Sequence, residues 1–169
     1  MLPSIKKILY ATDLSSNSAY AFRYAVKLAD LANAKITILY TLPLIDAAMV
    51  VPTIVQMGDE QYDTIREEQS RELIENIKLR LKDFTKKELK KEQSKIERVS
   101  AILVHEGDAV DEILTTAEHI DCDMIILGAH GKGILTHTFL GTVPDKVLRR
   151  SRKPVLIVPI PRDATDIDL

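Results

Sequence analysis

Short apolar runs alternate with longer amphipathic stretches along the chain. The runs are rich in β-branched residues, and stretches between them carry apolar residues at helical spacing, which predicts strands alternating with helices. Because such units are joined by right-handed crossovers, they predict an α/β fold with an open parallel sheet covered by helices on both faces. The five predicted strands are Ile8–Ala11, Ala34–Leu42, Val99–His105, Met124–Leu127 and Val155–Val158.

Polar residues mark the expected helix ends. Ser15–Ser18 follows the first strand as an N-cap region, and the helix that it opens should fade near Asn33. Asp108 is a second predicted N-cap, with Asp111 three residues on, close to a capping box. A long helix is predicted from Tyr62, on the spacing of Ile65, Leu73, Ile77, Leu81 and Phe84.

Two segments depart from this pattern. Residues 43–60 include an apolar patch broken by Pro52, which favours a loop folded over its own domain; a flap that contacts a ligand or partner is the alternative. Lys86–Arg98 carries charges of both signs, which favours a solvated helical extension or linker over a nucleic-acid patch. The sequence shows no internal repeat, so we expect one domain over residues 1–169, with a core at about 6–159.

Composition narrows the function classes. The 169 residues are 46% hydrophobic and 28% charged, with a formal net charge of -2, so nothing global favours nucleic acid or an anionic membrane. No run approaches the ~18 apolar residues of a membrane span. The single cysteine, Cys122, lies in an apolar run and is expected to be a buried, inert thiol. A reducing compartment, the cytoplasm, is expected.

Candidate binding residues follow the strands, because ligands of an open parallel sheet lie beyond the carboxyl ends of its strands. Asp13, Thr41, Gly107 and Gly128 stand at these positions. Gly128 opens the most informative stretch. It is followed by Ala129, His130 and Gly131, then by nine residues, and then by Gly141 and Thr142.

This stretch predicts two half-sites for phosphate. Gly128 and Gly131 permit backbone angles and close approach that a Cβ would forbid. At Gly141 and Thr142 a helix begins, with Thr142 as its expected cap, and free N–H groups at a helix start bind anions. Pro144 fits the first helical turn but removes one of these donors.

Known phosphate motifs do not fit. Gly128 and Gly133 have the Walker spacing, but Ile134 replaces the required lysine, and no GxGxxG follows the first strand. A receiver-type phosphorylation domain would show an acidic pair after the first strand and an aspartate at the end of the third. Here Asp13 stands alone, and the third strand ends in His105 and Glu106.

The chain resembles the universal stress protein (UspA) family, specifically its ATP-binding branch. Gly128, Gly131, Gly141 and Thr142 match the family signature of Gly, two residues, Gly, nine residues, Gly and then Ser or Thr. The opening KKILYATDLS, the Gly107-Asp108 turn and KPVLIVP from Lys153 are further landmarks, so the resemblance runs from about residue 6 to 159. It implies a Rossmann-like sheet in the order 3-2-1-4-5 and a homodimer through the last strand, around Val155–Pro159.

The resemblance also implies roles for individual residues, with ATP and Mg²⁺ as the ligand. Asp13 would lie beside the adenosine, although capping of the next helix is an equal alternative. His130 and Lys132 are either phosphate contacts or exposed loop residues. The full set of implied nucleotide-binding residues is Ala11, Thr12, Asp13, Thr41, Leu127, Gly128, His130, Gly131, Lys132, Gly141, Thr142 and Val143.

These observations predict an ATP-binding stress-response protein that acts as a sensor or regulator on a partner the sequence does not name. No carboxylate pair or aligned base is visible near the glycine motif, so at most slow ATP hydrolysis or self-phosphorylation is expected. The alternative is a protein–protein adaptor of the same fold that binds no nucleotide. The lengthened Lys86–Arg98 segment has no role in either account.

Overall fold

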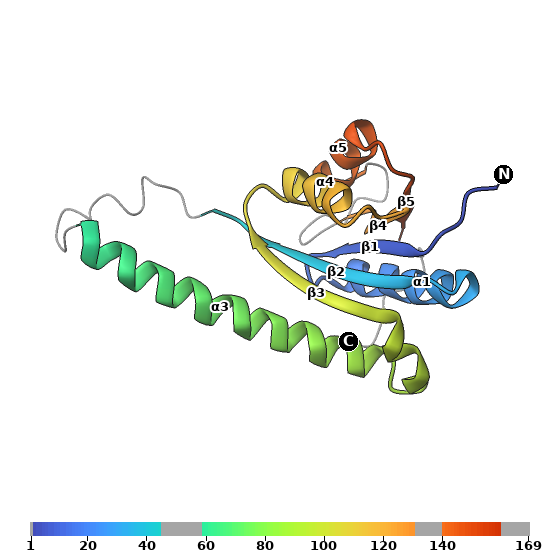
Figure 1. The fold of residues 1–169 in the computed structure, drawn as a ribbon, viewed down its shortest axis with the longest axis horizontal. Coiled ribbons are helices and arrows are strands. Elements are labelled where there is room, and N and C mark those ends of the chain that lie inside the picture. Colours follow the sequence, from blue (N-terminus) through green and yellow to red (C-terminus); the bar gives the residue numbers. More distant parts are fainter. Residues whose placement is uncertain (1, 45–58, 131–139, 160–169) are drawn as a thin grey trace.

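The computed structural model describes residues 2–44, 59–130 and 140–159. Its centre is a five-stranded sheet in the order β3-β2-β1-β4-β5, in which all neighbouring strands are parallel (Figure 1). This confirms the predicted α/β class and the strand order that the resemblance implied. The strands are β1 Lys7–Thr12, β2 Lys35–Leu42, β3 Val99–Glu106, β4 Met124–Gly128 and β5 Val155–Val158.

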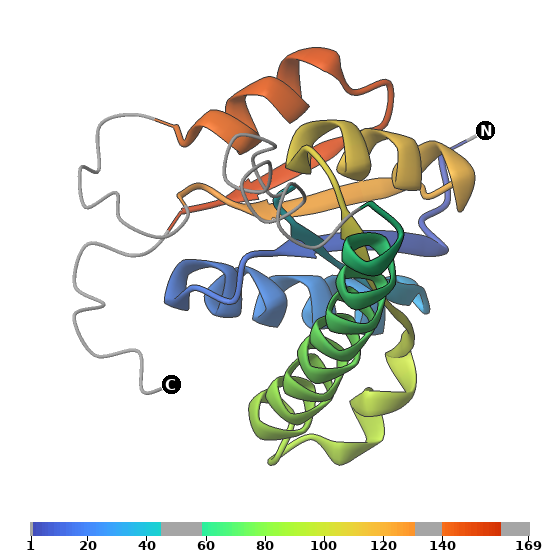
Figure 2. The same ribbon diagram turned by 90° about the vertical axis from the view of Figure 1, so that its left-hand side faces the viewer.

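Helices cover both faces of the sheet. The helices α1 (Ser16–Ala32) and α3 (Asp59–Glu88) lie on one face, and α4 (Ala109–His119) and α5 (Thr142–Arg150) lie on the other (Figures 1 and 2). A 3₁₀ helix, η1 (Gln93–Arg98), precedes β3. The strand order reverses beside β1, so the chain leaves β1 and β4 toward opposite faces, and the carboxyl ends of these strands border a crevice.

Strand β1 is the centre of the core. Ile8 and Tyr10 pack in the layer under α1 and α3, whereas Leu9 and Ala11 pack in the layer under α4 and α5. All four are buried. Because both faces are covered, the strand reads as one continuous apolar run rather than an alternating one. Each large side chain buried in this way contributes about 1.5–3 kcal/mol relative to full exposure.

The ends of α1 agree with the sequence prediction. Ser15 is the N-cap, and its side chain accepts a hydrogen bond from the Ser18 N–H. Asn33 ends the helix in the left-handed region, with φ 53°, a conformation that asparagine tolerates better than most residues. Its side-chain oxygen accepts a hydrogen bond from the Arg98 guanidinium at 2.5 Å, which ties the end of α1 to η1.

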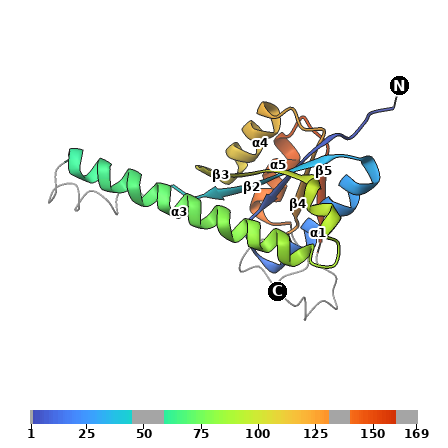
Figure 3. The same ribbon diagram turned by 60° about the horizontal axis from the view of Figure 1, so that its bottom comes forward.

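Helix α3 begins at Asp59, one turn before the predicted start at Tyr62. Ile77 and Leu81 are buried against the sheet, while the first half of the helix projects beyond the strands (Figures 1 and 3). The projecting part has no apolar surface to cover, which explains its largely charged sequence. The structure does not describe residues 45–58, so both alternatives for the 43–60 segment lie largely outside the described residues.

The Lys86–Arg98 segment was predicted to be a solvated helical extension or a linker, and it contains both the last turn of α3 and the connection to β3. Helix α3 ends at Glu88, and the chain turns into η1. Lys95 and Arg98 form ion pairs with Asp30 of α1, at 3.4 and 3.7 Å. These pairs and the partly buried Ile96 anchor η1 against the end of α1.

Cys122 is buried, as predicted, and burial raises the pKa of its thiol, which keeps the sulfur protonated and unreactive. Within residues 2–44, 59–130 and 140–159, no helix is both long enough and apolar enough to cross a membrane.

Asp108 caps α4 as predicted. Its Oδ1 accepts hydrogen bonds from the N–H groups of Val110 and Asp111, at 2.9 and 3.1 Å. The Asp111 carboxylate instead accepts a hydrogen bond from Arg150 at 2.8 Å, so a reciprocal capping box is not formed.

Replacing Asp108 with alanine should therefore lower the free energy of unfolding by about 1 kcal/mol, because two N–H groups lose their acceptor. Asp108→Ser should keep most of the stability, and Glu118→Ala, an exposed change on the same helix, should stay within about 0.5 kcal/mol of the parent. Urea unfolding checks all three. Equal losses for Asp108→Ala and Glu118→Ala would show that the cap is not a stabilising contact.

Candidate functional site

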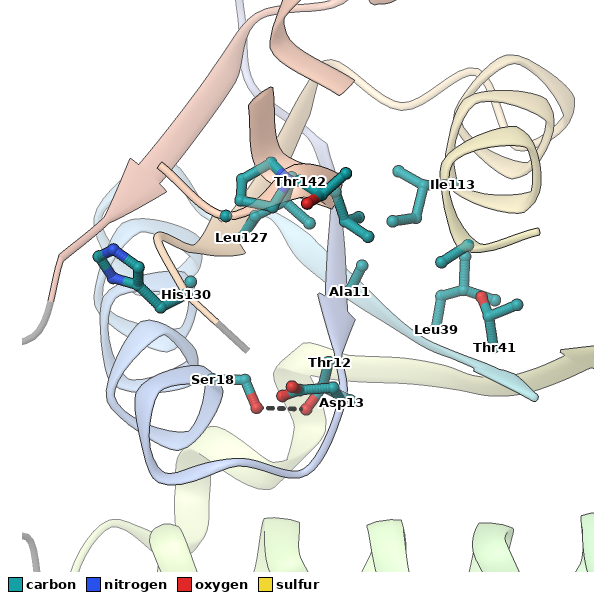
Figure 4. Close-up of a pocket in the computed structure, with 15 residues that line it drawn as sticks. Ala11, Thr12, Asp13, Ser18, Leu39, Thr41, Ile113, Leu127, His130 and Thr142 are labelled. Atoms are coloured by element: carbon teal, nitrogen blue, oxygen red, sulfur yellow. Dashed lines mark hydrogen bonds between the residues drawn. The ribbon is translucent and has the colours of Figure 1, made fainter. Parts of the chain in front are cut away.

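A cavity of about 270 Å³ lies at the carboxyl ends of the central strands (Figure 4). It is on the α4 and α5 side of the sheet, as a continuation of the core layer that contains Leu9 and Ala11. Small residues make up part of its walls. These residues are Ala11, Ala109, Gly128 and Gly141.

The structure brings together every predicted site residue that it describes. Ala11, Thr12 and Asp13 come from the end of β1, Thr41 from β2, and Leu127 and Gly128 from β4. The remaining lining residues of the predicted set are His130, Gly141, Thr142 and Val143. Gly131 and Lys132 lie outside the described residues.

Sequence reasoning missed part of the apolar wall. Leu39 and Ile113 line the cavity on the side of β2 and α4 (Figure 4). A signal for Leu39 was available, because it stands two residues before Thr41 and so faces the same side of the sheet. Ile113 is also a core residue, at 3% exposure. The other missed lining residues are Ser18, Ala109 and Pro144.

Asp13 holds the turn between β1 and α1. Its Oδ1 accepts hydrogen bonds from the backbone N–H of Ser15 at 3.0 Å and from the Ser15 hydroxyl at 2.5 Å. Ser15 is itself the N-cap of α1, so Asp13 supports the start of this helix through Ser15. This contact corresponds to the alternative role predicted for Asp13, capping of the next helix. Asp13 also lines the cavity, so a carboxylate lies at the cavity wall.

A hydroxyl chain joins β1 to the first turn of α1. The Oγ atoms of Thr12 and Ser18 lie 2.8 Å apart (Figure 4). Ser18 Oγ donates to the Ser15 carbonyl at 3.0 Å, so Thr12 is the donor in the shared bond. Tyr10 adds a second link, because its buried hydroxyl donates to the Ser18 carbonyl at 2.5 Å. Burial raises the pKa of Tyr10 above its ordinary value, which keeps this donor protonated.

Asn17 fixes the other side of the crevice and was not singled out in the sequence. Its side-chain amide donates a hydrogen bond to the His130 carbonyl, which joins α1 to the chain after β4. A Cβ on Gly128 would stand 3.3 Å from the Asn17 amide group. Gly128 is therefore needed for close packing of α1 on β4. The expected unusual backbone angle is not found, since Gly128 is an ordinary strand residue.

The start of α5 differs from the prediction by one residue. Gly141, not Thr142, is the N-cap, and no side chain caps the helix. The Gly141 N–H donates to the Ala129 carbonyl at 2.8 Å, and a Cβ on Gly141 would stand 3.1 Å from that oxygen. This packing draws Gly141 against the end of β4, so Thr142 becomes the first helical residue and the prediction that it caps α5 is wrong.

The first turn of α5 has two N–H groups without a partner inside the helix. Asp145 N–H bonds to the Gly141 carbonyl at 3.0 Å, and Pro144 has no N–H. Thr142 and Val143 carry the two remaining donors, which point away from the body of the helix at its positive end. Both residues line the cavity, so its α5 side suits an anion and its β2 side suits an apolar group.

No preformed cation cage accompanies these groups. Among the described residues, no cluster of three or more His, Cys, Asp or Glu side chains could hold a metal ion. Asp13 is the one carboxylate among the described lining residues. This donor set fits a Mg²⁺ ion that is held mainly by phosphate oxygens and water, with one protein carboxylate nearby.

Comparison with known proteins identifies the family of the chain. The chain is 30% identical over 165 residues to universal stress protein MJ0577 of Methanocaldococcus jannaschii, covering 90% of this chain and 94% of that protein. The solved structure of MJ0577 superimposes with a TM-score of 0.71 at 25% identity, covering 94% of this chain and 99% of that one. A universal stress protein family protein from Arabidopsis thaliana, solved with AMP bound, has a TM-score of 0.53 at 18% identity, with 96% and 97% coverage. The model of the universal stress protein family matches residues 4–159. The chain therefore belongs to the universal stress protein family.

Proposed function

We propose that this protein binds ATP in the cavity and acts as a cytoplasmic sensor or regulator of the stress response. The observation that carries the proposal is that one cavity contains both an apolar slot and the N-terminus of a helix, which suits an anion. A free phosphate would use only the second feature, and an apolar ligand only the first. A nucleotide uses both. Recovery of the native protein outside the cytoplasm on cell fractionation would contradict the proposed location.

The apolar slot suits the base. Leu39, Ile113 and Leu127 form its walls, and Thr41 stands at the end of β2 beside them. At about 270 Å³ the cavity is close to the lower end of ordinary ligand pockets, about 300–1,000 Å³. It has room for a base and part of a ribose, so the phosphates extend to the mouth of the cavity.

The phosphates would meet the start of α5. The N–H groups of Thr142 and Val143 would donate to phosphate oxygens, and the dipole of α5 adds attraction for negative charge. Asp13, at the end of β1, would face the ribose. Gly131 and Lys132 are proposed as further phosphate contacts. The Arabidopsis relative supports this ligand class only in that the same fold holds an adenine nucleotide in that protein.

The apolar slot can be tested by filling it. Ala109 is half-buried at the first position of α4 and lines the cavity. Ala109→Trp should place an indole in the slot and weaken Mg-ATP binding by about tenfold or more in isothermal titration calorimetry. The increase in melting temperature on addition of Mg-ATP should also be smaller for this variant than for the parent.

Thr115→Trp is the matched control, because Thr115 is exposed on the same helix outside this cavity. It should bind Mg-ATP like the parent. Equal affinity for the parent and both folded variants would place the nucleotide elsewhere. If the parent shows no heat of binding, no thermal shift and no co-purified nucleotide by mass spectrometry, the adaptor function without nucleotide would replace this proposal.

Binding without efficient turnover is the expected chemistry. Asp13 is the only described lining residue with a carboxylate, and Ser15 occupies its Oδ1, so the described lining holds no carboxylate pair that could work together as acid and base. The steady-state ATPase rate should fall far below the ~10 s⁻¹ typical of dedicated enzymes. A rate in that range, retained through purification to homogeneity, would show that the site is catalytic.

We also propose a homodimer through β5. Among the described residues, this strand lies at one edge of the sheet and pairs with β4 alone. Pairing of two β5 edges would satisfy the backbone groups that an edge strand leaves open. Light scattering coupled to gel filtration should give twice the mass of one chain. A monomer mass over the accessible concentration range would contradict the dimer.

A further inference from the structure

A groove of about 370 Å³ runs between α3 and the outer edge of β3. β3 and β5 are the two edge strands of the sheet, so the groove lies at the opposite edge from β5. The cavity proposed for the nucleotide is a separate site. Four consecutive residues of β3, Val99–Ile102, line it. Successive side chains of a strand point to opposite faces, so a wall of consecutive residues must be the edge of the strand itself.

Within the part of the chain that the structure describes, no strand pairs with the outer edge of β3. β3 is the first strand in the sheet order, with β2 as its neighbour. None of the residues Val99–Ile102 is fully buried, and Ser100 is exposed. On such a strand, alternate N–H and C=O groups point outward without a partner in the sheet. This row of donors and acceptors is a template for an added strand.

The charged residues that line the groove are all lysines. Lys78, Lys82 and Lys86 recur at every fourth position of α3 and form a stripe beside β3. Helix α3 and strand β3 run side by side in both views (Figures 1 and 3). Lys78 also pairs with Glu75 at 2.8 Å on the neighbouring turn, and its side chain remains 33% exposed.

The spacing of the stripe matches that of a strand. Residues four apart on a helix are separated by about 6 Å along its axis. Side chains on one face of a strand recur at about 6.6 Å. An extended segment with acidic residues at alternate positions could therefore place one carboxylate near each lysine. Its other side chains would face away from α3, while Ile96 and Ile102 supply an apolar floor.

We propose that this groove binds an acidic peptide segment of a partner protein, which adds to the sheet as a sixth strand beside β3. Backbone hydrogen bonds would supply affinity, and the lysine stripe would select acidic residues at alternate positions. The function of the site is independent of nucleotide binding. It gives a role to the end of α3 and to η1, the region of the lengthened Lys86–Arg98 segment.

The same lysines could serve only to keep two β3 edges apart, since charged side chains often protect an exposed edge. The two roles differ in what they predict. A protective stripe binds no peptide, and its removal increases self-association. A recognition stripe binds an acidic strand, and its removal weakens that binding.

The test uses the full chain and a fluorescein-labelled peptide of four Glu-Val repeats. Fluorescence anisotropy should show binding, and the Lys78→Gln, Lys82→Gln, Lys86→Gln triple variant should bind about tenfold more weakly, because three charge pairs are lost. The matched control changes Lys87, Lys90 and Lys91 to glutamine. These lysines are exposed but lie outside the groove, so the control should bind within about twofold of the parent.

Amide hydrogen exchange separates strand addition from loose charge attraction. On addition of the peptide, alternate amides within Val99–Ile102 should exchange more slowly, in the parent and in the control variant. Failure of the peptide to bind, equal binding by both triple variants, or binding without slowed β3 amides would overturn the proposal. Slow β3 amides without peptide, lost on dilution, would assign the edge to a second copy of this chain and overturn it as well.

Discussion

The reversal of strand order beside β1 is the constraint on which the site depends. β1 pairs with β2 on one side and β4 on the other, and the helices that follow β1 and β4 lie on opposite faces. None of the described helices therefore covers the crevice between the two carboxyl ends. The burial of β1 on both faces fixes this geometry, since its side chains anchor both core layers. The crevice is thus bordered by a strand that is buried on both faces.

The chain converts this crevice into a specific site through small residues and backbone donors. Gly141 packs on the Ala129 carbonyl and Gly128 packs on Asn17, and these contacts set the start of α5 and of α1 against β4. The glycines of the family signature that the structure describes thus act first on packing. The chemistry of the site comes from their neighbours, the N–H groups of Thr142 and Val143.

Local signals in the sequence predicted the strands, the caps at Ser15 and Asp108, and the end of α1 at Asn33. Each depends on a few adjacent residues. The errors arose where contacts distant in sequence decide the outcome. The α5 cap moved to Gly141 because of Ala129, and η1, which the sequence did not predict, is anchored because Asp30 pairs with Lys95. The role of Asn17 could not be predicted from the sequence, because its side chain bonds to the His130 carbonyl, which is far away in the chain. Most of the residues that line the cavity could be predicted, because they follow the ends of predicted strands or match the family resemblance.

The central claim is that the start of α5 and the apolar slot hold one nucleotide together. Backbone and methyl NMR spectra during a Mg-ATP titration test it most directly. The account predicts saturable shifts at the amides of Thr142 and Val143 and, with the same dissociation constant, at the methyl groups of Leu39 and Ile113. Shifts confined to other surfaces, or shifts at the α5 amides that inorganic phosphate alone reproduces while the methyl groups stay still, would contradict it.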